Sequence, residues 1–229
     1  LAASTSPDDK EKLNSIANEA KETAGSKVAT SMGTAIHSFT EQIDRGEDPD
    51  IPEKWRGDLD SYRRMIDHYG VEMNPSLIER VVVVPEYGVA GTFDRIVRVT
   101  KKVSLEIPSK GTVVLNPGDH VVGDVKTNKN LSYAVNEISI QLALYSRAEA
   151  MYNYGAGEYE KLPEIRKDVG LVFHVPVGKS DAKLHALDIE TGWKAAKLCD
   201  SVRAWRKMRG LSGTEAEVVP SSTWEDQIR

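Results

Sequence analysis

Four residues carry charged or imidazole side chains in settings where such groups are unusual. Asp94 interrupts an otherwise apolar strand pattern. Asp124 and Lys126 stand two residues apart in a valine-rich run, so strand alternation places both on one face. His37 lies at the border of an apolar helical stripe. Buried charges are costly unless they are paired or bind a metal, so these residues are candidate functional groups.

These residue types suit chemistry on a phosphate. Carboxylate oxygens are preferred ligands of hard divalent cations such as Mg²⁺ and Mn²⁺, and Mn²⁺ also accepts imidazole. Two carboxylates on neighbouring strands can hold such an ion, which activates water and clamps phosphate oxygens. A lysine two residues from one of them can orient the water and stabilise developing charge. The pattern predicts a phosphodiester-hydrolysing site that uses one or two Mg²⁺ or Mn²⁺ ions.

The motifs resemble the split D…[D/E]-x-K signature of the PD-(D/E)XK nuclease superfamily. Within it, the order of four motifs is similar to that of RecB-like exonucleases, a group that includes CRISPR-associated and phage-encoded members. The resemblance covers roughly residues 30–190, most of the chain. The motifs are Gly33-x3-His37, Gly91-x2-Asp94, Asp124-x-Lys126 and Gln141-x3-Tyr145.

The resemblance implies roles for individual residues. The implied metal ligands are His37, Asp94, Asp124 and the carbonyl of Val125. The implied catalytic groups are Lys126, Asp94, Asp124, Gln141 and Tyr145, with the last two facing the site from one side of a helix. Glu79 resembles a further acidic position of the group.

Cysteine content separates this chain from part of that group. Many CRISPR-associated and helicase-linked members have four cysteines that bind an iron–sulfur cluster, whereas Cys199 is the single cysteine here. We therefore expect no cluster, no internal disulfide and no cysteine-only zinc site. We expect Cys199 to be a small buried apolar residue.

Each candidate also has a purely structural interpretation. Asp94 could be a strand-end residue paired with Arg95 or Arg98. The Asp124–Lys126 pair could be exposed and of small energetic value. For Gln141 and Tyr145 the alternative is ordinary helix packing, and for His37 it is a histidine at the edge of the core. Glu41 is expected to be a solvated helix residue, and Glu79 could be a surface charge.

The hydrophobic periodicity predicts the elements that must position these residues. Helices are expected at 8–24, 28–45, 53–69, 133–152 and 192–209. Strands are expected at 78–85, 89–100, 120–126, 168–177 and 183–189, with a small hairpin insertion at 101–118. This order predicts an α/β fold: a central mixed β-sheet flanked by helices, with further helices at the N-terminus. The resemblance implies that this core is restriction-endonuclease-like.

A length of 229 residues, 40% of them apolar, suits one domain with a full hydrophobic core. We expect four parts: an N-terminal helical part (1–70), a catalytic core (76–190), a basic C-terminal helix (191–209) and a loose tail (210–229). Residues 191–210 include six basic residues and one acidic residue, which suits either a phosphate-tracking surface or a solvated helix. An apolar line is expected to dock this helix: Ala195, Leu198, Val202 and Trp205.

The resemblance implies a metal-dependent DNA exonuclease of phage or bacterial recombination, repair or replication. Its expected partners are single-stranded DNA or duplex ends, and recombination or replication proteins. The most apolar run, at 81–84, is far too short to span a membrane. The single cysteine fits a reducing setting, so a cytoplasmic location is expected. The alternatives are a catalytically silent DNA-binding module and a structure-specific or nicking endonuclease. Tyr133 and Tyr145 could stack on bases, although core packing is the simpler expectation for both.

Overall fold

The structure is a computed structural model that describes residues 11–12, 14–16, 19, 26–153 and 157–208. The helices are α2 (Ser26–Asp44), α3 (Glu53–Tyr69), α4 (Val135–Tyr145) and α5 (Ile189–Lys207), with a short 3-10 turn, η2 (Pro85–Tyr87). The strands are β1 (Val71–Val84), β2 (Val89–Val99), β3 (Val103–Ile107), β4 (Gly111–Leu115), β5 (His120–Lys126), β6 (Ala150–Asn153), β7 (Glu158–Glu160), β8 (Val169–His174) and β9 (Lys183–Asp188).

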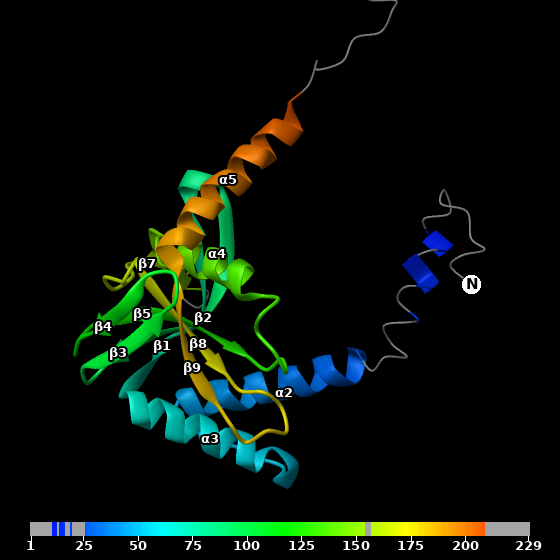
Figure 1. Cartoon of the computed structure of the whole chain (residues 1–229), viewed down its shortest axis with the longest axis vertical. Helices are drawn as coiled ribbons and strands as arrows, with labels where there is room; N and C mark the ends of the chain where they lie inside the picture. The colour runs from blue at the N-terminus through cyan, green and yellow to red at the C-terminus, as the bar shows by residue number, and fades with distance from the viewer. Residues whose placement is uncertain (1–10, 13, 17–18, 20–25, 154–156, 209–229) are drawn as a thin grey trace, which may run out of the picture.

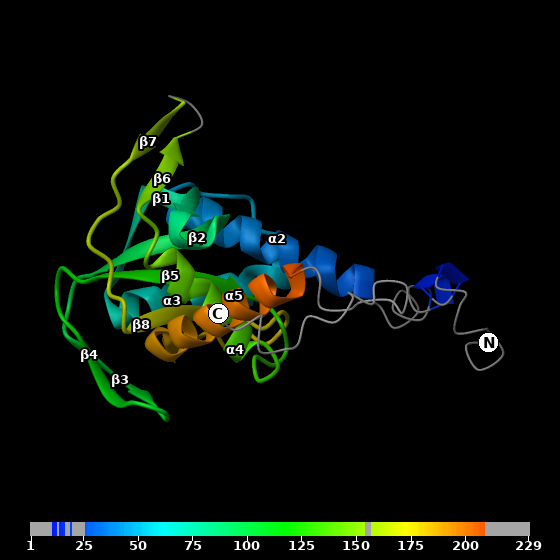
Figure 2. The same ribbon diagram turned by 90° about the horizontal axis from the view of Figure 1, so that it is seen from above.

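Seven strands form one sheet in the order β7-β6-β1-β2-β5-β8-β9, and β3 and β4 form a separate hairpin. β5 and β8 pair in parallel, whereas the other neighbours in the large sheet pair antiparallel. Figure 1 shows α2 and α3 on one side of the sheet and α4 and α5 on the other, and Figure 2 shows the same layers from above. The predicted α/β class, a mixed central sheet flanked by helices, is confirmed.

Each face of the sheet has its own hydrophobic cluster. The first includes Ile36 of α2 and Leu59 of α3 against the sheet. The second includes Leu142 of α4 and Ile189 of α5. β5 lies in the middle of the sheet and is covered on both faces, which explains its almost continuous run of valines. The helix predicted at 53–69 and the strand predicted at 120–126 have the predicted bounds, and the expected hairpin insertion is present as β3–β4.

The predicted helix at 133–152 is wrong in its second half. α4 ends at Tyr145, and Ala150–Asn153 form β6, which pairs with residues 81–83 of β1. Met151 of β6 is buried in the hydrophobic cluster that includes Leu142 of α4. Long-range strand pairing therefore overrides the local pattern here. β1 also begins at Val71, seven residues before the predicted strand, because Val71–Met73 pair with β2 beyond an irregularity between Met73 and Ile78.

The docking face predicted for the C-terminal helix is also wrong. Leu198, Val202 and Trp205 are exposed, and so is Cys199. α5 docks instead through its first two turns, which bury Ile189, Gly192 and Ala196, and its second half projects from the body (Figure 1). The physical reason is the close approach of Gly192 to α4, which fixes how α5 is rotated.

Two predicted segments cannot be compared. The helix predicted at 8–24 lies largely outside the described residues, and the tail at 210–229 lies wholly outside them. In the part of the chain that is described, the helices lack a stretch both long and apolar enough to cross a membrane.

Gly192 should be intolerant of any side chain. A Cβ there would collide with the backbone carbonyl of Ser139 in α4, which cannot move without shifting the helix. We expect Gly192→Ala to lower the free energy of unfolding by about 1–3 kcal/mol in urea denaturation. Gly57→Ala on α3 is the matched control, because its Cβ would meet the rotatable hydroxyl of Ser180 and alanine favours the helix. Equal stability of the two variants would contradict this packing.

Candidate metal and phosphodiester site

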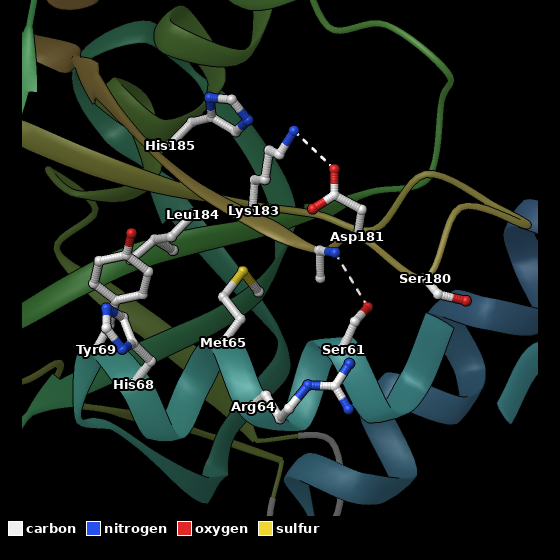
Figure 3. Close-up of a pocket in the computed structure, with 11 residues that line it drawn as sticks. Ser61, Arg64, Met65, His68, Tyr69, Ser180, Asp181, Lys183, Leu184 and His185 are labelled. Atoms are coloured by element: carbon white, nitrogen blue, oxygen red, sulfur yellow. Dashed lines mark hydrogen bonds and ion pairs between the residues drawn. The ribbon is translucent and has the colours of Figure 1, made fainter. Parts of the chain in front are cut away.

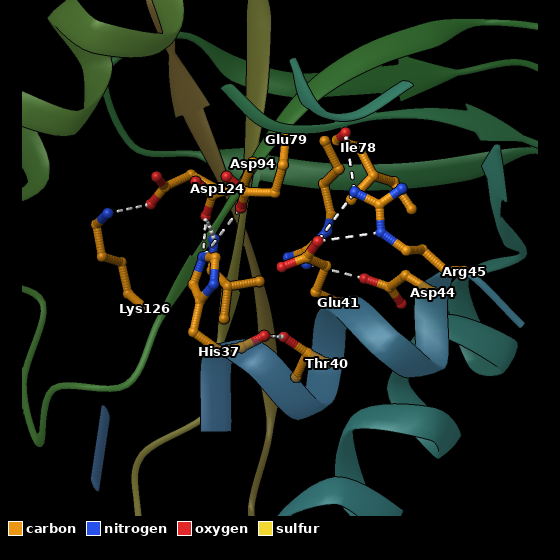
Figure 4. A network of polar contacts seen from close by, with 12 residues as sticks. His37, Thr40, Glu41, Asp44, Arg45, Ile78, Glu79, Asp94, Asp124 and Lys126 are labelled. Carbon is orange, nitrogen blue, oxygen red and sulfur yellow. Dashed lines mark hydrogen bonds and ion pairs between the residues drawn. The ribbon is translucent and has the colours of Figure 1, made fainter. Parts of the chain in front are cut away.

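Asp94 is the point where three elements meet (Figure 4). Its Oδ2 lies 2.9 Å from Nε2 of His37 on α2 and accepts a hydrogen bond of 2.8 Å from the backbone amide of Val125 on β5. Asp94 itself belongs to β2. The structure thus brings together three residues predicted from motifs that lie far apart in the sequence. The alternative pairing of Asp94 with Arg98 is not what the structure shows, since Arg98 pairs with Glu72.

Asp124 and Lys126 lie on the neighbouring strand, as predicted. β2 pairs with β5 through Arg95 and Gly123, one residue away from Asp94 and Asp124. Nζ of Lys126 lies 2.5 Å from Oδ2 of Asp124, as a close charge pair rather than an aligned hydrogen bond. The Asp124 side chain is 3% exposed, so the interpretation as an exposed surface pair is wrong.

Burial and proximity shift the pKa values of these groups. Burial, together with the charge of Asp94, raises the pKa of Asp124 to about 6, although Lys126 opposes the shift. Burial would also raise the pKa of Asp94, but the hydrogen bond and charge of His37 outweigh it and hold that pKa below its ordinary value. The same hydrogen bond raises the pKa of His37. At neutral pH, both carboxylates are therefore available as anions.

Two glutamates extend the site beyond the prediction. Ligand atoms of His37, Glu41 and Glu79 all lie within 4.8 Å of one another, although Glu41 was expected to be solvated and surface charge was one interpretation of Glu79. The i, i+4 spacing of His37 and Glu41 was the available signal for Glu41. Glu41 Oε1 also accepts two hydrogen bonds from Arg45, which hold it in place.

Glu79 has two unusual features. Its Oε1 is buried without a hydrogen-bond partner and lies 3.8 Å from Nε2 of His37. Its φ is +51°, in the left-handed region that residues other than glycine rarely adopt. Such backbone strain is typical of functional sites. Nothing in the sequence pattern indicates this conformation.

The motif glycines allow close packing. A Cβ at Gly33 would meet the hydroxyl of Thr127, which follows β5, at 2.6 Å. A Cβ at Gly91 would meet the ring of Tyr145 at 2.8 Å. Gln141 donates a hydrogen bond of 3.1 Å to the hydroxyl of Tyr145. Gln141 and Tyr145 thus contact each other, and the Tyr145 ring packs against β2 at Gly91, three residues before Asp94. The catalytic roles of Gln141 and Tyr145 stay predictions.

The donor set fits a hard divalent cation. Nε2 of His37 lies 2.9 Å from Oδ2 of Asp94 and 3.8 Å from Oε1 of Glu79, and Asp124 lies on the strand next to Asp94. The buried oxygen of Glu79 lacks a hydrogen bond. An oxygen-rich set with one imidazole matches Mg²⁺ or Mn²⁺. His37, Glu41 and Glu79 are the residues whose ligand atoms lie within 4.8 Å of one another, and the metal-binding roles of Asp94 and Asp124 stay predictions. The Val125 amide supports Asp94, whereas the implied role of its carbonyl stays a prediction.

The expectation that Tyr133 packs in the core is wrong, because it is 91% exposed in the segment between Lys126 and α4. Lys129 in the same segment is also exposed. Both residues belong to the segment that follows Lys126, and exposed aromatic and cationic side chains are of the kind that contact nucleic-acid strands.

A hollow of about 590 Å³ lies elsewhere, between α3 and β9 (Figure 3). Lys183 in its wall pairs with Asp181, and Ser61 accepts a hydrogen bond from the amide of Ala182. The hollow does not include the carboxylates around His37. The cluster around His37 therefore remains the better candidate for a metal site, despite the size of this hollow.

Asp124→Asn should stabilise the metal-free protein. The pKa of Asp124 lies above its ordinary value of 3.8 in the folded state, so this group's contribution to stability falls as pH rises from about 4 to 6. Above that range, the fold bears the full cost of the buried charge. We expect Asp124→Asn to raise the free energy of unfolding in EDTA by about 1–3 kcal/mol at pH 7, with no gain at pH 4. Exposed Asp181→Asn is the control, and a loss of stability at pH 7 would contradict the assignment.

Comparison with known proteins adds no family to this picture. No model of a known protein family matches the sequence, and no curated protein is significantly similar to it.

Proposed function

We propose that the chain is a divalent-metal-dependent deoxyribonuclease that hydrolyses phosphodiester bonds as an exonuclease. One observation carries the proposal. Asp94 of β2 lies 2.9 Å from His37, Asp124 lies on the neighbouring strand β5, and Lys126 pairs with Asp124. Two carboxylates and a lysine on neighbouring strands, with an imidazole from α2, form a set suited to hydrolysis of a phosphodiester.

In this proposal, His37, Asp94 and Asp124 hold the cation. Mg²⁺ or Mn²⁺ bound there would stabilise negative charge on the phosphate oxygens. The Val125 amide keeps Asp94 oriented, since it donates to the same oxygen that meets His37. Glu79 supplies a further oxygen next to the imidazole.

Lys126 is proposed to act on the water and the phosphate rather than on the cation. The Lys126 side chain is 28% exposed, so it reaches from the buried carboxylate towards the solvent from which water and substrate come. A donor at this place can orient the attacking water and stabilise charge that develops on the phosphate. The water oxygen forms a bond to phosphorus while the bond from phosphorus to the 3′ oxygen breaks. The products are a 5′-phosphate and a 3′-hydroxyl.

The choice of DNA as substrate rests on the resemblance of the four motifs to RecB-like exonucleases. The same resemblance supports a setting in phage or bacterial recombination, repair or replication, and a cytoplasmic location. The exposed Tyr133 and Lys129, in the segment that follows Lys126, are consistent with a nucleic-acid partner. Exposed basic residues on α5 could follow the phosphates further away, namely Lys194, Lys197, Arg206 and Lys207.

Cleavage of end-labelled linear DNA, single- and double-stranded, tests the proposal. We expect shortening with Mn²⁺ or Mg²⁺ and none with EDTA. Asp124→Asn and Lys126→Met should each lower the rate by about 100-fold or more, because each removes a group that acts in the transition state. Asp181→Asn and Lys102→Met change exposed residues of the same types outside the site and should retain the wild-type rate.

The outcome also separates the alternatives. Cleavage of circular DNA would identify an endonuclease, because an exonuclease needs an end. Metal binding and DNA binding without cleavage of any substrate would contradict the proposal and indicate a silent binding module.

A further inference from the structure

Two contacts join the same pair of elements, α2 and β2. At the first, His37 Nε2 lies 2.9 Å from Asp94 Oδ2. At the second, Asp44 Oδ2 lies 2.9 Å from Nη2 of Arg95. His37 and Asp44 are seven residues apart on α2, which is about two helical turns, and Asp94 and Arg95 are adjacent on β2. Figure 4 shows both His37 and Asp44 on α2.

The second contact is completely buried. The side chains of Arg95 and Asp44 are both 0% exposed. The hydroxyl of Tyr62 on α3 lies 2.8 Å from each carboxylate oxygen of Asp44 and donates to them. The three side chains therefore connect α2, α3 and β2 beneath the candidate site.

Stability alone does not account for this triad. All three guanidinium nitrogens of Arg95, Nε, Nη1 and Nη2, are buried without hydrogen-bond partners, so the Nη2 contact with Asp44 is an ion pair without an aligned hydrogen bond. Burying a guanidinium group with unpaired donors is costly, and well-packed apolar residues are often at least as stable as a buried ion pair. A role in fixing how α2 lies on β2 would explain why charged side chains are buried at this position.

We propose that Arg95, Asp44 and Tyr62 are positioning residues that set the rotation and register of α2 on β2. Since His37 lies on the same helix and Asp94 on the same strand, the triad holds the imidazole against the Asp94 carboxylate. The triad makes no contact with the cation or substrate. The inference rests on the proposed function in so far as His37 and Asp94 hold a cation.

The test replaces the triad as a unit with apolar residues of similar volume: Asp44→Leu, Tyr62→Phe and Arg95→Met. The triple variant leaves no buried charge or hydroxyl unpaired, so its thermal midpoint should equal or exceed that of the wild type. We expect its Mn²⁺ association constant, measured by calorimetry, to fall by about 10- to 100-fold, as for other groups that orient metal ligands. A folded triple variant with wild-type Mn²⁺ affinity would overturn the inference.

Asp58→Asn is the matched control. Asp58 is a buried carboxylate on α3 that accepts hydrogen bonds of 2.7 Å from the amides of Gly178 and Ser180, away from α2 and β2. This change should lower the thermal midpoint and leave the Mn²⁺ affinity unchanged. A loss of affinity equal to that of the triple variant would show that any weakening of the fold acts on the site, and would overturn the positioning role.

Tyr62→Phe is the second variant, for use if the triple variant does not fold. It removes one hydroxyl from α3, and we expect Mn²⁺ affinity to fall by about three-fold because Asp44 is then held less firmly. An unchanged affinity in this variant would overturn the inference.

A metal-free readout distinguishes this inference from the proposed function. The Val125 amide and the His37 ring both contact Asp94 Oδ2, so the wild type should give a nuclear Overhauser contact between them. If the wild type binds no Mn²⁺, the cation site of the proposed function fails, and loss of this contact in the triple variant still supports the triad. Persistence of the contact in the folded triple variant would overturn it.

Discussion

A single carboxylate oxygen, Oδ2 of Asp94, holds three elements of this molecule together. It meets the imidazole of His37 on α2 and accepts the backbone amide of Val125 on β5. Removal of this oxygen would leave an amide of a buried strand and an imidazole without their partners. A carboxylate inside an apolar strand is costly by itself, so these partners are what allow it to remain there as an anion.

The two strands β1 and β2 depart from regular strand geometry around Asp94. Phe93 packs with the α4 side of the sheet, whereas Arg95, two residues later, pairs with Asp44 on the α2 side. In a regular strand these two residues would share a face, so β2 changes face at Asp94. On β1, Glu79 adopts a left-handed conformation between residues that pair with Phe93 and Arg95. Local irregularities of this kind are common next to active sites, where they redirect a side chain.

The layers of the fold, and the residues predicted on α2, β2 and β5, follow from local patterns. Those patterns are strong because β5 is buried on both faces and α2 has a regular apolar stripe. Contacts made only in the folded chain account for what the sequence does not indicate. Met151 joins a strand because β1 pairs with it, and Trp205 is exposed because Gly192 sets the rotation of α5. The left-handed Glu79 has no local signal, since its strain is supported by the surrounding sheet.

The central claim is that these carboxylates and the imidazole form one site for a divalent cation. Anomalous diffraction from crystals grown with Mn²⁺ tests it most directly, because it locates the ion without any assumption about the substrate. The account predicts a manganese peak coordinated by Asp94, Asp124 and His37. A well-ordered crystal at saturating Mn²⁺ with no peak there, or with an ion bound only by residues outside this cluster, would contradict it.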